Sequence, residues 1–179
     1  MRYIRLFENF GDYDPYELMI LPPNKKGEML MGELKKYNPN LDLVRDLITL
    51  GANLNWQGEY GYAALHWCAM NYRLEITKML IDAGADLNVQ DENGMTALHL
   101  CAAYNRIEVA KMLIDAGADL NVQDWRLSYT PLHECARKSY PEIAKMLIDA
   151  GADKTIQDDD GKLPYEIAKT QELKKLLKP

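Results

Sequence analysis

The chain has 179 residues, a formal net charge of −6 and three cysteines. This length suffices for one compact domain or one short repeat array, and the acidic balance argues against nucleic acid as the main ligand. No apolar run reaches the roughly 18 residues of a membrane helix, and the start, MRYIRLFENFGDYD, has no signal-peptide pattern, so we expect a cytoplasmic protein that does not bind membranes.

Residues 1–24 follow no repeat pattern, although both phenylalanines of the chain, Phe7 and Phe10, fall there, before a break at Pro22–Pro23. We expect this segment to pack over the unit that follows, and a separate contact surface is the alternative. Residues 25–57 align with the later units through NLDLVRDLITLGANLN, from Asn40 to Asn55, and residues 25–37 would supply a first helix. They are predicted to form an N-terminal cap.

The same unit then recurs three times, over residues 58–90, 91–123 and 124–157. KMLIDAGADLNVQD occupies residues 78–91 and returns unchanged at 111–124, and KMLIDAGADKTIQD follows at 145–158. The other half of each unit carries YAALHWCA at 62–69, MTALHLCA at 95–102 and YTPLHECA at 129–136. Residues 158–179 keep part of the pattern and end in a lysine-rich helix, which predicts a C-terminal cap with a polar outer face.

Each tetrapeptide of the TPLH type predicts the start of a helix. Thr130 is a good N-cap residue and Pro131 suits the first helical position, and Thr96 keeps the capping oxygen in the second unit. Ala63 has no such oxygen, a loss worth about 1 kcal/mol, so the first unit's opening helix should fray most easily.

A second helix is predicted in each unit from the apolar stripe that Ile76, Met79 and Leu80 represent. Left-handed C-terminal caps are expected just past these helices at Gly51, Gly84, Gly117 and Gly151. A helix pair with a turn is too small to bury its own apolar face, so stability must come from stacking on neighbouring units.

The 33-residue period, the TPLH-type tetrapeptide and the Gly-Ala-Asp turn resemble the ankyrin repeat, from about Leu41 to the C-terminus. The resemblance implies an all-α solenoid of stacked helix-turn-helix units joined by β-hairpin-like turns. It also implies that the imidazoles of His66, His99 and His133 tie adjacent turns together, and that Asn88 and Asn121 lie where asparaginyl hydroxylases modify some ankyrin repeats.

No cofactor, metal site or catalytic group is predicted. Cys68, Cys101 and Cys135 are separated by 33 and 34 residues and should behave as small buried hydrophobes. Stacked units would hold them roughly 8–10 Å apart, beyond the reach of a disulfide. Met79, Met112 and Met146 recur at one helical position, which favours core filling.

In the resembling family, turn tips and first-helix ends line the concave surface that binds partners. Carried over residue by residue, the contact positions are Glu59, Tyr60, Tyr62, Met70, Asn71, Glu92, Asn93, Met95, Tyr104, Trp125, Arg126, Leu127, Ser128, Tyr129, Arg137, Lys138, Asp159 and Asp160. Trp56 suits contact or packing equally, and Trp67 is expected mostly to pack.

The turn of the third unit, DWRLSYT from Asp124 to Thr130, is one residue longer than its counterparts and has no glycine. We expect a different turn there, because glycine tolerates positive φ and its loss removes that freedom. The helix start beyond it is intact, and the tip has gained a tryptophan, an arginine and a tyrosine, so this turn is the leading candidate for the contact site.

The sequence therefore favours a non-catalytic adaptor or inhibitor, monomeric by preference. Its protein partner would offer an acidic or polar segment and an apolar anchor. Family analogy also allows a viral or bacterial effector that acts on host machinery. The alternatives are a small-molecule or nucleotide sponge that uses the third unit's basic and aromatic residues, and an enzyme, which would need a deep pocket involving residues 1–24.

Overall fold

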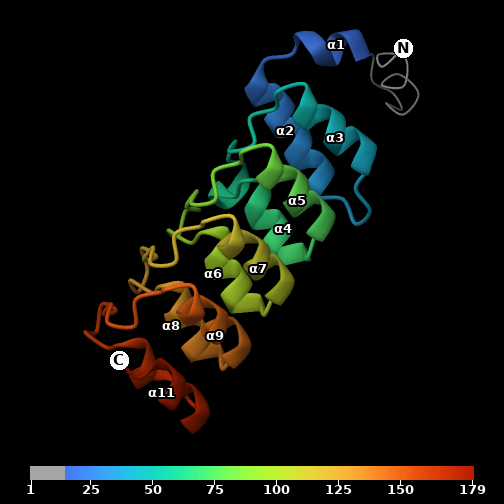
Figure 1. Cartoon of the computed structure of the whole chain (residues 1–179). Coiled ribbons are helices and arrows are strands. Elements are labelled where there is room, and N and C mark those ends of the chain that lie inside the picture. The colour runs from blue at the N-terminus through green and yellow to red at the C-terminus, as the bar shows by residue number, and fades with distance from the viewer. Residues whose placement is uncertain (1–14) are drawn as a thin grey trace.

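The computed structural model describes residues 15–179, which form an elongated stack of helix pairs with the two ends far apart (Figure 1). This part of the chain contains no strand, which confirms the all-α repeat architecture. The helices are α1 (Pro15–Ile20), α2 (Pro23–Leu34), α3 (Leu41–Thr49), α4 (Ala64–Asn71), α5 (Leu74–Asp82), α6 (Ala97–Tyr104), α7 (Ile107–Asp115), α8 (Pro131–Lys138), α9 (Pro141–Asp149), α10 (Pro164–Ile167) and α11 (Gln171–Leu177).

The segment before the repeats contributes the short helix α1, which the sequence pattern did not predict. Leu18 of α1 is buried, and Lys26 of α2 donates from Nζ to the carbonyls of Met19 and Leu50 at 3.3 and 2.7 Å. Pro23 is the first residue of α2 rather than part of a break, because proline has no N–H to lose at a helix start. Phe7, Phe10 and Tyr13 lie outside the described residues.

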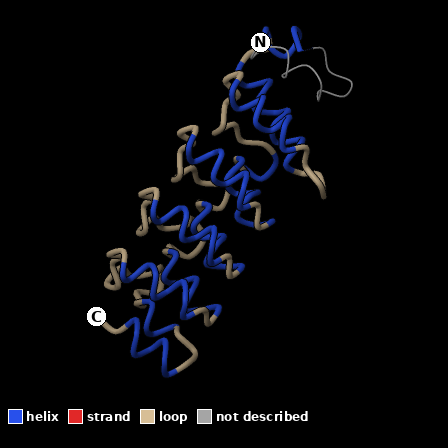
Figure 2. Tube along the Cα trace, turned by 45° about the vertical axis from the view of Figure 1, so that its right-hand side comes forward, coloured by secondary structure: helices blue, strands red, loops and turns tan. Residues whose placement is uncertain are grey.

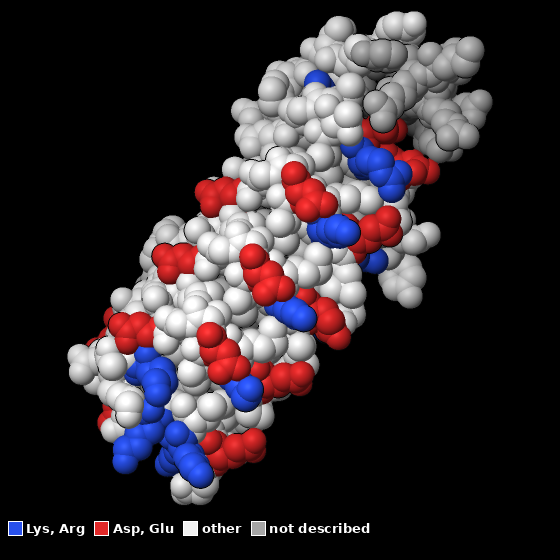
Figure 3. All heavy atoms as spheres, in the orientation of Figure 1, with Lys and Arg blue, Asp and Glu red and all other residues white. Residues whose placement is uncertain are grey.

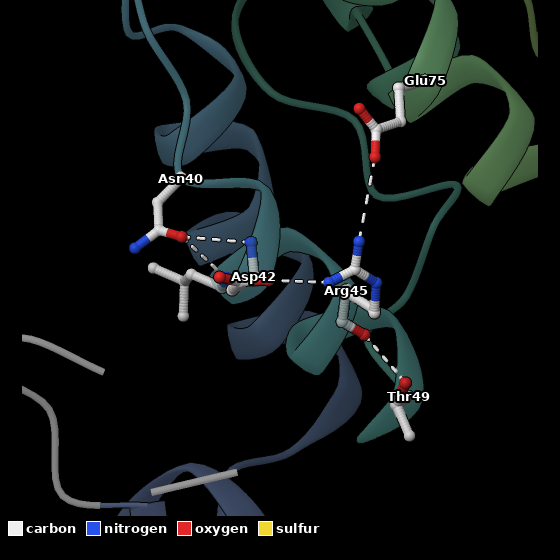
Figure 4. Close-up of polar contacts among 6 residues, drawn as sticks. Asn40, Asp42, Arg45, Thr49 and Glu75 are labelled. Atoms are coloured by element: carbon white, nitrogen blue, oxygen red, sulfur yellow. Dashed lines mark hydrogen bonds and ion pairs between the residues drawn. The ribbon is translucent and has the colours of Figure 1, made fainter. Parts of the chain in front are cut away.

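Polar contacts fix the start of α3 (Figure 4). The Asn40 side chain accepts the N–H groups of Asp42 and Leu43, both at 3.1 Å, as an N-cap residue should. Arg45 pairs with Asp42 at 2.7 Å and reaches Glu75 of α5 at 3.8 Å, so it links the first helix pair to the next. Such exposed pairs contribute at most about 1 kcal/mol.

The three central units repeat one helix pair, α4 with α5, α6 with α7 and α8 with α9, and the long turns all project to the same side (Figure 2). Leu80, Leu113 and Leu147 are fully buried between pairs. The cysteines are free and buried, as predicted, and burial raises the pKa of the Cys68 thiol to about 12. The repeated methionines lie half-buried beside the core rather than inside it, because the buried position of each second helix is the leucine that follows them.

Each histidine bridges two successive turns. His99 Nδ1 accepts the N–H of Thr96 at 3.1 Å, and its Nε2 lies 2.9 Å from the carbonyl oxygen of Tyr129 in the next unit. His66 makes the same contacts with Ala63 and Met95, and His133 makes them with Thr130 and Lys162. Since Nδ1 accepts an N–H, the proton of the neutral ring resides on Nε2, which donates to the next unit.

The side-chain amides of glutamine and asparagine residues also form hydrogen bonds between successive units. Gln57 donates from Nε2 to Gly61 in its own turn and to Gln90 of the next unit, at 2.7 and 2.8 Å. Gln90 and Gln123 repeat this arrangement one unit further on. Asn88 and Asn121 each accept the N–H of an aspartate in the following unit at 2.8 Å. The polar residues that recur in the sequence are therefore connectors between units.

The last unit differs from the others at the histidine position. Glu166 stands there and accepts the N–H of Leu163 at 2.7 Å, as the imidazole Nδ1 does in the earlier units. Thr170 then caps α11, whose Leu173 and Leu177 are buried while its lysines face outward.

Helix caps in the three units follow the sequence prediction. The hydroxyl oxygens of Thr96 and Thr130 accept the N–H groups of His99 and His133, whereas Ala63 offers no acceptor. Positive φ values occur at Gly51, Gly84, Gly117 and Gly151, also as predicted.

Replacing Ala63 by threonine should raise the free energy of unfolding by about 1 kcal/mol, because the backbone there is extended as it is at Thr96 and Thr130. Urea denaturation followed by circular dichroism measures the change. Thr96→Ala is the matched control and should lose about the same amount. An unchanged midpoint for Ala63→Thr would show that the first cap does not limit stability.

Stability should also fall as the pH drops below about 6.5. Burial lowers the pKa of His66, His99 and His133 below the unfolded value of 6.5, so the folded rings stay neutral while unfolded histidines take up protons. The stabilisation is complete above the unfolded pKa and is lost as the pH falls toward the folded values.

Urea midpoints between pH 8 and pH 5 test this dependence, and the measurement should be repeated with His99→Gln. The slope between pH 7 and pH 5 should be shallower in the variant. Identical slopes in the two proteins would remove His99 from the explanation.

Candidate functional site

The turn tips form a second line of contacts outside the helices. The N–H groups of Glu92, Trp125 and Asp159 donate to the carbonyls of Tyr60, Asn93 and Leu127, at 3.0, 2.8 and 3.0 Å. Within each tip the chain closes on itself, as in the bond from the Asp124 N–H to the Tyr129 carbonyl at 2.8 Å. The tips are therefore hairpin-like and are joined edge to edge along the stack.

The third tip differs from our sequence-based expectation. It retains a left-handed residue, because Ser128 has a φ of 53° and occupies the place that Gly94 holds in the second tip, with a φ of 78°. The turn differs from its counterparts as predicted, because it closes from Asp124 to Tyr129 where the second tip closes from Asp91 to Met95, but the expected loss of a positive φ with the glycine is wrong. Serine adopts the strained conformation, and its hydroxyl donates to the Asp159 carboxylate of the next tip. The inserted residue is accommodated on the N-terminal side of Ser128.

Asp124 organises this longer tip from inside. Its buried carboxylate accepts three backbone N–H groups, those of Arg126, Leu127 and Tyr129, at 3.3, 3.0 and 3.1 Å. Because its acceptor oxygen is committed to the turn, Asp124 is a structural residue rather than a free charge.

Trp125 lies at the start of the third tip and packs against the second tip. Its indole is 65% exposed, yet it lies so close to Gly94 that a Cβ added there would be 2.6 Å from the Trp125 Cγ. Contact with the glycine surface and the bond from its N–H to Asn93 hold the residue in place while leaving most of the ring open to solvent.

A hollow of about 360 Å³ lies between the second and third tips and the first helices. Its apolar lining comes from Tyr62, Met95, Leu100, Ala103, Tyr104 and Leu127, and its polar lining from Asn93, Asp124, Arg126, Glu134, Arg137 and Lys138. We call this region the central hollow.

The central hollow contains an ion pair with a buried carboxylate, at a position where the first and second units have no charged residue. Glu134 is 5% exposed, and its Oε2 accepts from Arg137 Nη2 at 2.6 Å. The equivalent pairs are Trp67 with Met70 in the first unit and Leu100 with Ala103 in the second, both apolar. A carboxylate in this position is costly unless it is paired, and Arg137 supplies that pairing.

The predicted contact residues divide into those that line the central hollow and those that do not. The first group is Tyr62, Asn93, Met95, Tyr104, Arg126, Leu127, Arg137 and Lys138. The remainder lie elsewhere on the tips and helix ends: Glu59, Tyr60, Met70, Asn71, Glu92, Trp125, Ser128, Tyr129, Asp159 and Asp160.

Several tip residues are partly engaged within the fold. The rings of Tyr129 and His133 stack with centroids 5.3 Å apart, and Tyr62 packs edge-on against Trp67 at 6.0 Å. Glu59 pairs with Lys35 at 3.0 Å. Trp56 and Trp67 are half-buried against the core, which agrees with packing for Trp67.

Sequence reasoning placed Ala103 at a first-helix end but missed Glu134 and Leu100 as members of the lining. They lie between the fixed histidine and the helix end, where the chain looks like scaffold. The signal was present in the comparison of copies, since Glu134 is the one charged residue at a position that is otherwise tryptophan, leucine or isoleucine.

Comparison with known families decides the assignment. A family described as ankyrin repeats in three copies matches residues 30–124, and one described as ankyrin repeats in many copies matches residues 101–148. The chain belongs to the ankyrin-repeat family. No curated protein matches this ankyrin-repeat chain.

Ankyrin repeats generally mediate protein–protein interaction and are generally not catalytic. Among residues 15–179 of this ankyrin-repeat protein, no group of three or more histidine, cysteine, aspartate or glutamate residues is placed to hold a metal ion. None of the helices in that range is both long enough and apolar enough to cross a membrane.

Gly94→Ala should destabilise this ankyrin-repeat protein more than Gly117→Ala does. Both glycines have positive φ, 78° and 87°, but an added Cβ meets Trp125 only at Gly94 and open space at Gly117. We expect a loss of about 1 kcal/mol at Gly117 and at least about 2 kcal/mol at Gly94.

Thermal unfolding measures the two losses, and the indole N–H resonance of Trp125 should shift only in Gly94→Ala. Equal losses in the two variants would mean that Trp125 does not rest on Gly94 in solution.

Proposed function

We propose that this ankyrin-repeat protein is a non-catalytic adaptor or inhibitor that binds a protein partner at the central hollow and the adjoining third tip. One observation carries the proposal. The bonds between units are the same along the stack, while the third unit alone changes both its tip and its first-helix end, and both changes line the same hollow.

Exposed apolar side chains support a protein partner. Trp125, Tyr104 and Leu127 are 65%, 52% and 48% exposed, although each belongs to a well-packed unit. Tryptophan, tyrosine and arginine are the residues that most often dominate binding energy at protein interfaces. Such large side chains around one hollow favour a contact surface over scattered surface residues.

The charge around the hollow favours a partner segment that is acidic or polar. Arg126 and Lys138 make no ion pair with any residue in the range 15–179. On the face drawn in Figure 3, acidic and basic side chains alternate along most of the stack, and basic side chains gather at the C-terminal end, where α11 lies, and not at residues that line the hollow. Opposite charge on a partner would steer its approach, and burial of an apolar anchor would supply affinity.

The structure gives less support to a nucleotide or small-molecule sponge. The hollow is open, and half of its lining is apolar, which suits a protein segment better than a phosphorylated small molecule. Catalysis is not proposed, since the titratable groups Asp124 and Glu134 are bound to the turn and to Arg137. The proposal places the protein in the cytoplasm, where the buried thiols stay reduced.

Affinity capture with the full chain as bait tests the proposal, by comparing wild type with Trp125→Ala/Arg126→Ala. Tyr129 is left intact because its ring stacks on His133. A specific partner should be retained by wild type and lost by the variant. With the purified partner, Trp125→Ala alone should cost about 2 kcal/mol, or roughly 30-fold in Kd.

Lys111→Ala, an exposed change on the second-helix side, is the matched control and should bind like wild type. Equal capture by the tip variant and the control would place the interface elsewhere.

A further inference from the structure

The third unit has exchanged an apolar pair for an ion pair at one place in its first helix. Glu134 replaces Leu100, and Arg137 replaces Ala103. Replacing such a buried pair by hydrophobic residues often leaves stability unchanged or raises it, so the pair is weak evidence for a stabilising role. Its place in the lining of the central hollow suggests another purpose.

The geometry of the pair leaves Arg137 partly available. Glu134 accepts only from Nη2, at 2.6 Å, and no other bond joins the Arg137 side chain to a residue of the described chain. The Glu134 side chain is 6% exposed, whereas that of Arg137 is 42% exposed. The Glu134 carboxylate therefore holds the guanidinium through one Nη2 hydrogen, while Nε and Nη1 have no partner among the described residues. A guanidinium held in this way can bind a second carboxylate through two parallel hydrogen bonds, one from the second Nη2 hydrogen and the other from Nη1 or Nε.

The surroundings of Arg137 supply the other requirements of a small recognition site. Met95 and Tyr104 offer apolar surface within the same hollow, where Tyr104 is 52% exposed. Arg126, the inserted residue of the third tip, and Lys138 add positive charge from either side. The second acidic residue of the lining, Asp124, accepts three backbone N–H groups on Oδ1 and makes no ion pair with a described residue.

We infer that the central hollow binds a segment of the partner protein that carries an aspartate or glutamate next to an apolar residue. The carboxylate pairs with Arg137, the apolar side chain rests on Met95 and Tyr104, and Glu134 is a positioning residue that orients Arg137. This inference rests on the proposed function and specifies the chemistry that the site selects.

The chain offers its own matched variant for the test. Glu134→Leu/Arg137→Ala transplants the second unit's pair into the third unit, where the surrounding repeat already accommodates leucine and alanine. This variant should fold with a urea midpoint at or above that of wild type. Peptides selected from a random phage-displayed library on the full wild-type chain serve as probes, and their affinities are measured by fluorescence polarisation.

The selected peptides should contain aspartate or glutamate close to an aromatic or aliphatic residue. Replacing that carboxylate by its amide should weaken binding to wild type by at least about tenfold, and should matter little to Glu134→Leu/Arg137→Ala. Glu134→Gln should keep the discrimination between acid and amide, because glutamine still accepts from Nη2. Lys111→Ala should match wild type throughout.

Three results overturn the inference: no acidic peptide is enriched, the amide peptides bind as well as the acids, or the double variant keeps the discrimination. Loss of discrimination in Glu134→Gln would reject the positioning role of Glu134. If selected peptides lose binding with Trp125→Ala/Arg126→Ala but not with Glu134→Leu/Arg137→Ala, the proposed function stands and this inference falls. If neither variant affects them, both fall.

Discussion

Each histidine ring joins two units through one imidazole, with Nδ1 accepting the N–H at the start of its own helix and Nε2 donating to the next turn. Both bonds need a neutral ring in a buried position. The bond from Nε2 also needs a carbonyl of the next turn within hydrogen-bond distance. The threonine caps, the glutamine and asparagine connectors and the leucine layer between helix pairs all keep successive units in that relation. Where Glu166 replaces the ring, the carboxylate keeps the acceptor role toward the N–H at the start of its own helix.

Most of the scaffold was predictable because it depends on local chemistry that repeats. A threonine before a helix accepts the same N–H groups wherever it occurs, and a glycine after a helix adopts the same left-handed conformation, so Thr130 and Gly117 could be assigned from sequence. The segment KMLID, which is identical in the three second helices, likewise allowed their buried leucines to be predicted. The start of α2 at Pro23 and the presence of α1 were missed, because the segment before residue 25 has no copy for comparison.

The candidate site was less predictable because it depends on neighbours in space. Nothing local shows that Asp124 accepts three N–H groups of its own turn, or that Ser128 adopts a positive φ in place of glycine. Trp125 could be recognised as unusual, but its contact with Gly94 of the preceding unit follows from the stacking of tips. Glu134 stands out from its apolar counterparts in the sequence, but its burial and its bond to Arg137 follow only from the structure.

The extra residue of the third tip leaves the bonds on both sides of it in register. The Trp125 N–H still reaches Asn93 behind it, and the Leu127 carbonyl still receives Asp159 ahead of it, so the added length is absorbed within a single turn. The length of one tip can therefore change without changing the distance between successive units. An ankyrin stack built in this way can acquire a new binding surface by insertion at a tip while every other unit keeps its position, which separates the evolution of specificity from the evolution of stability.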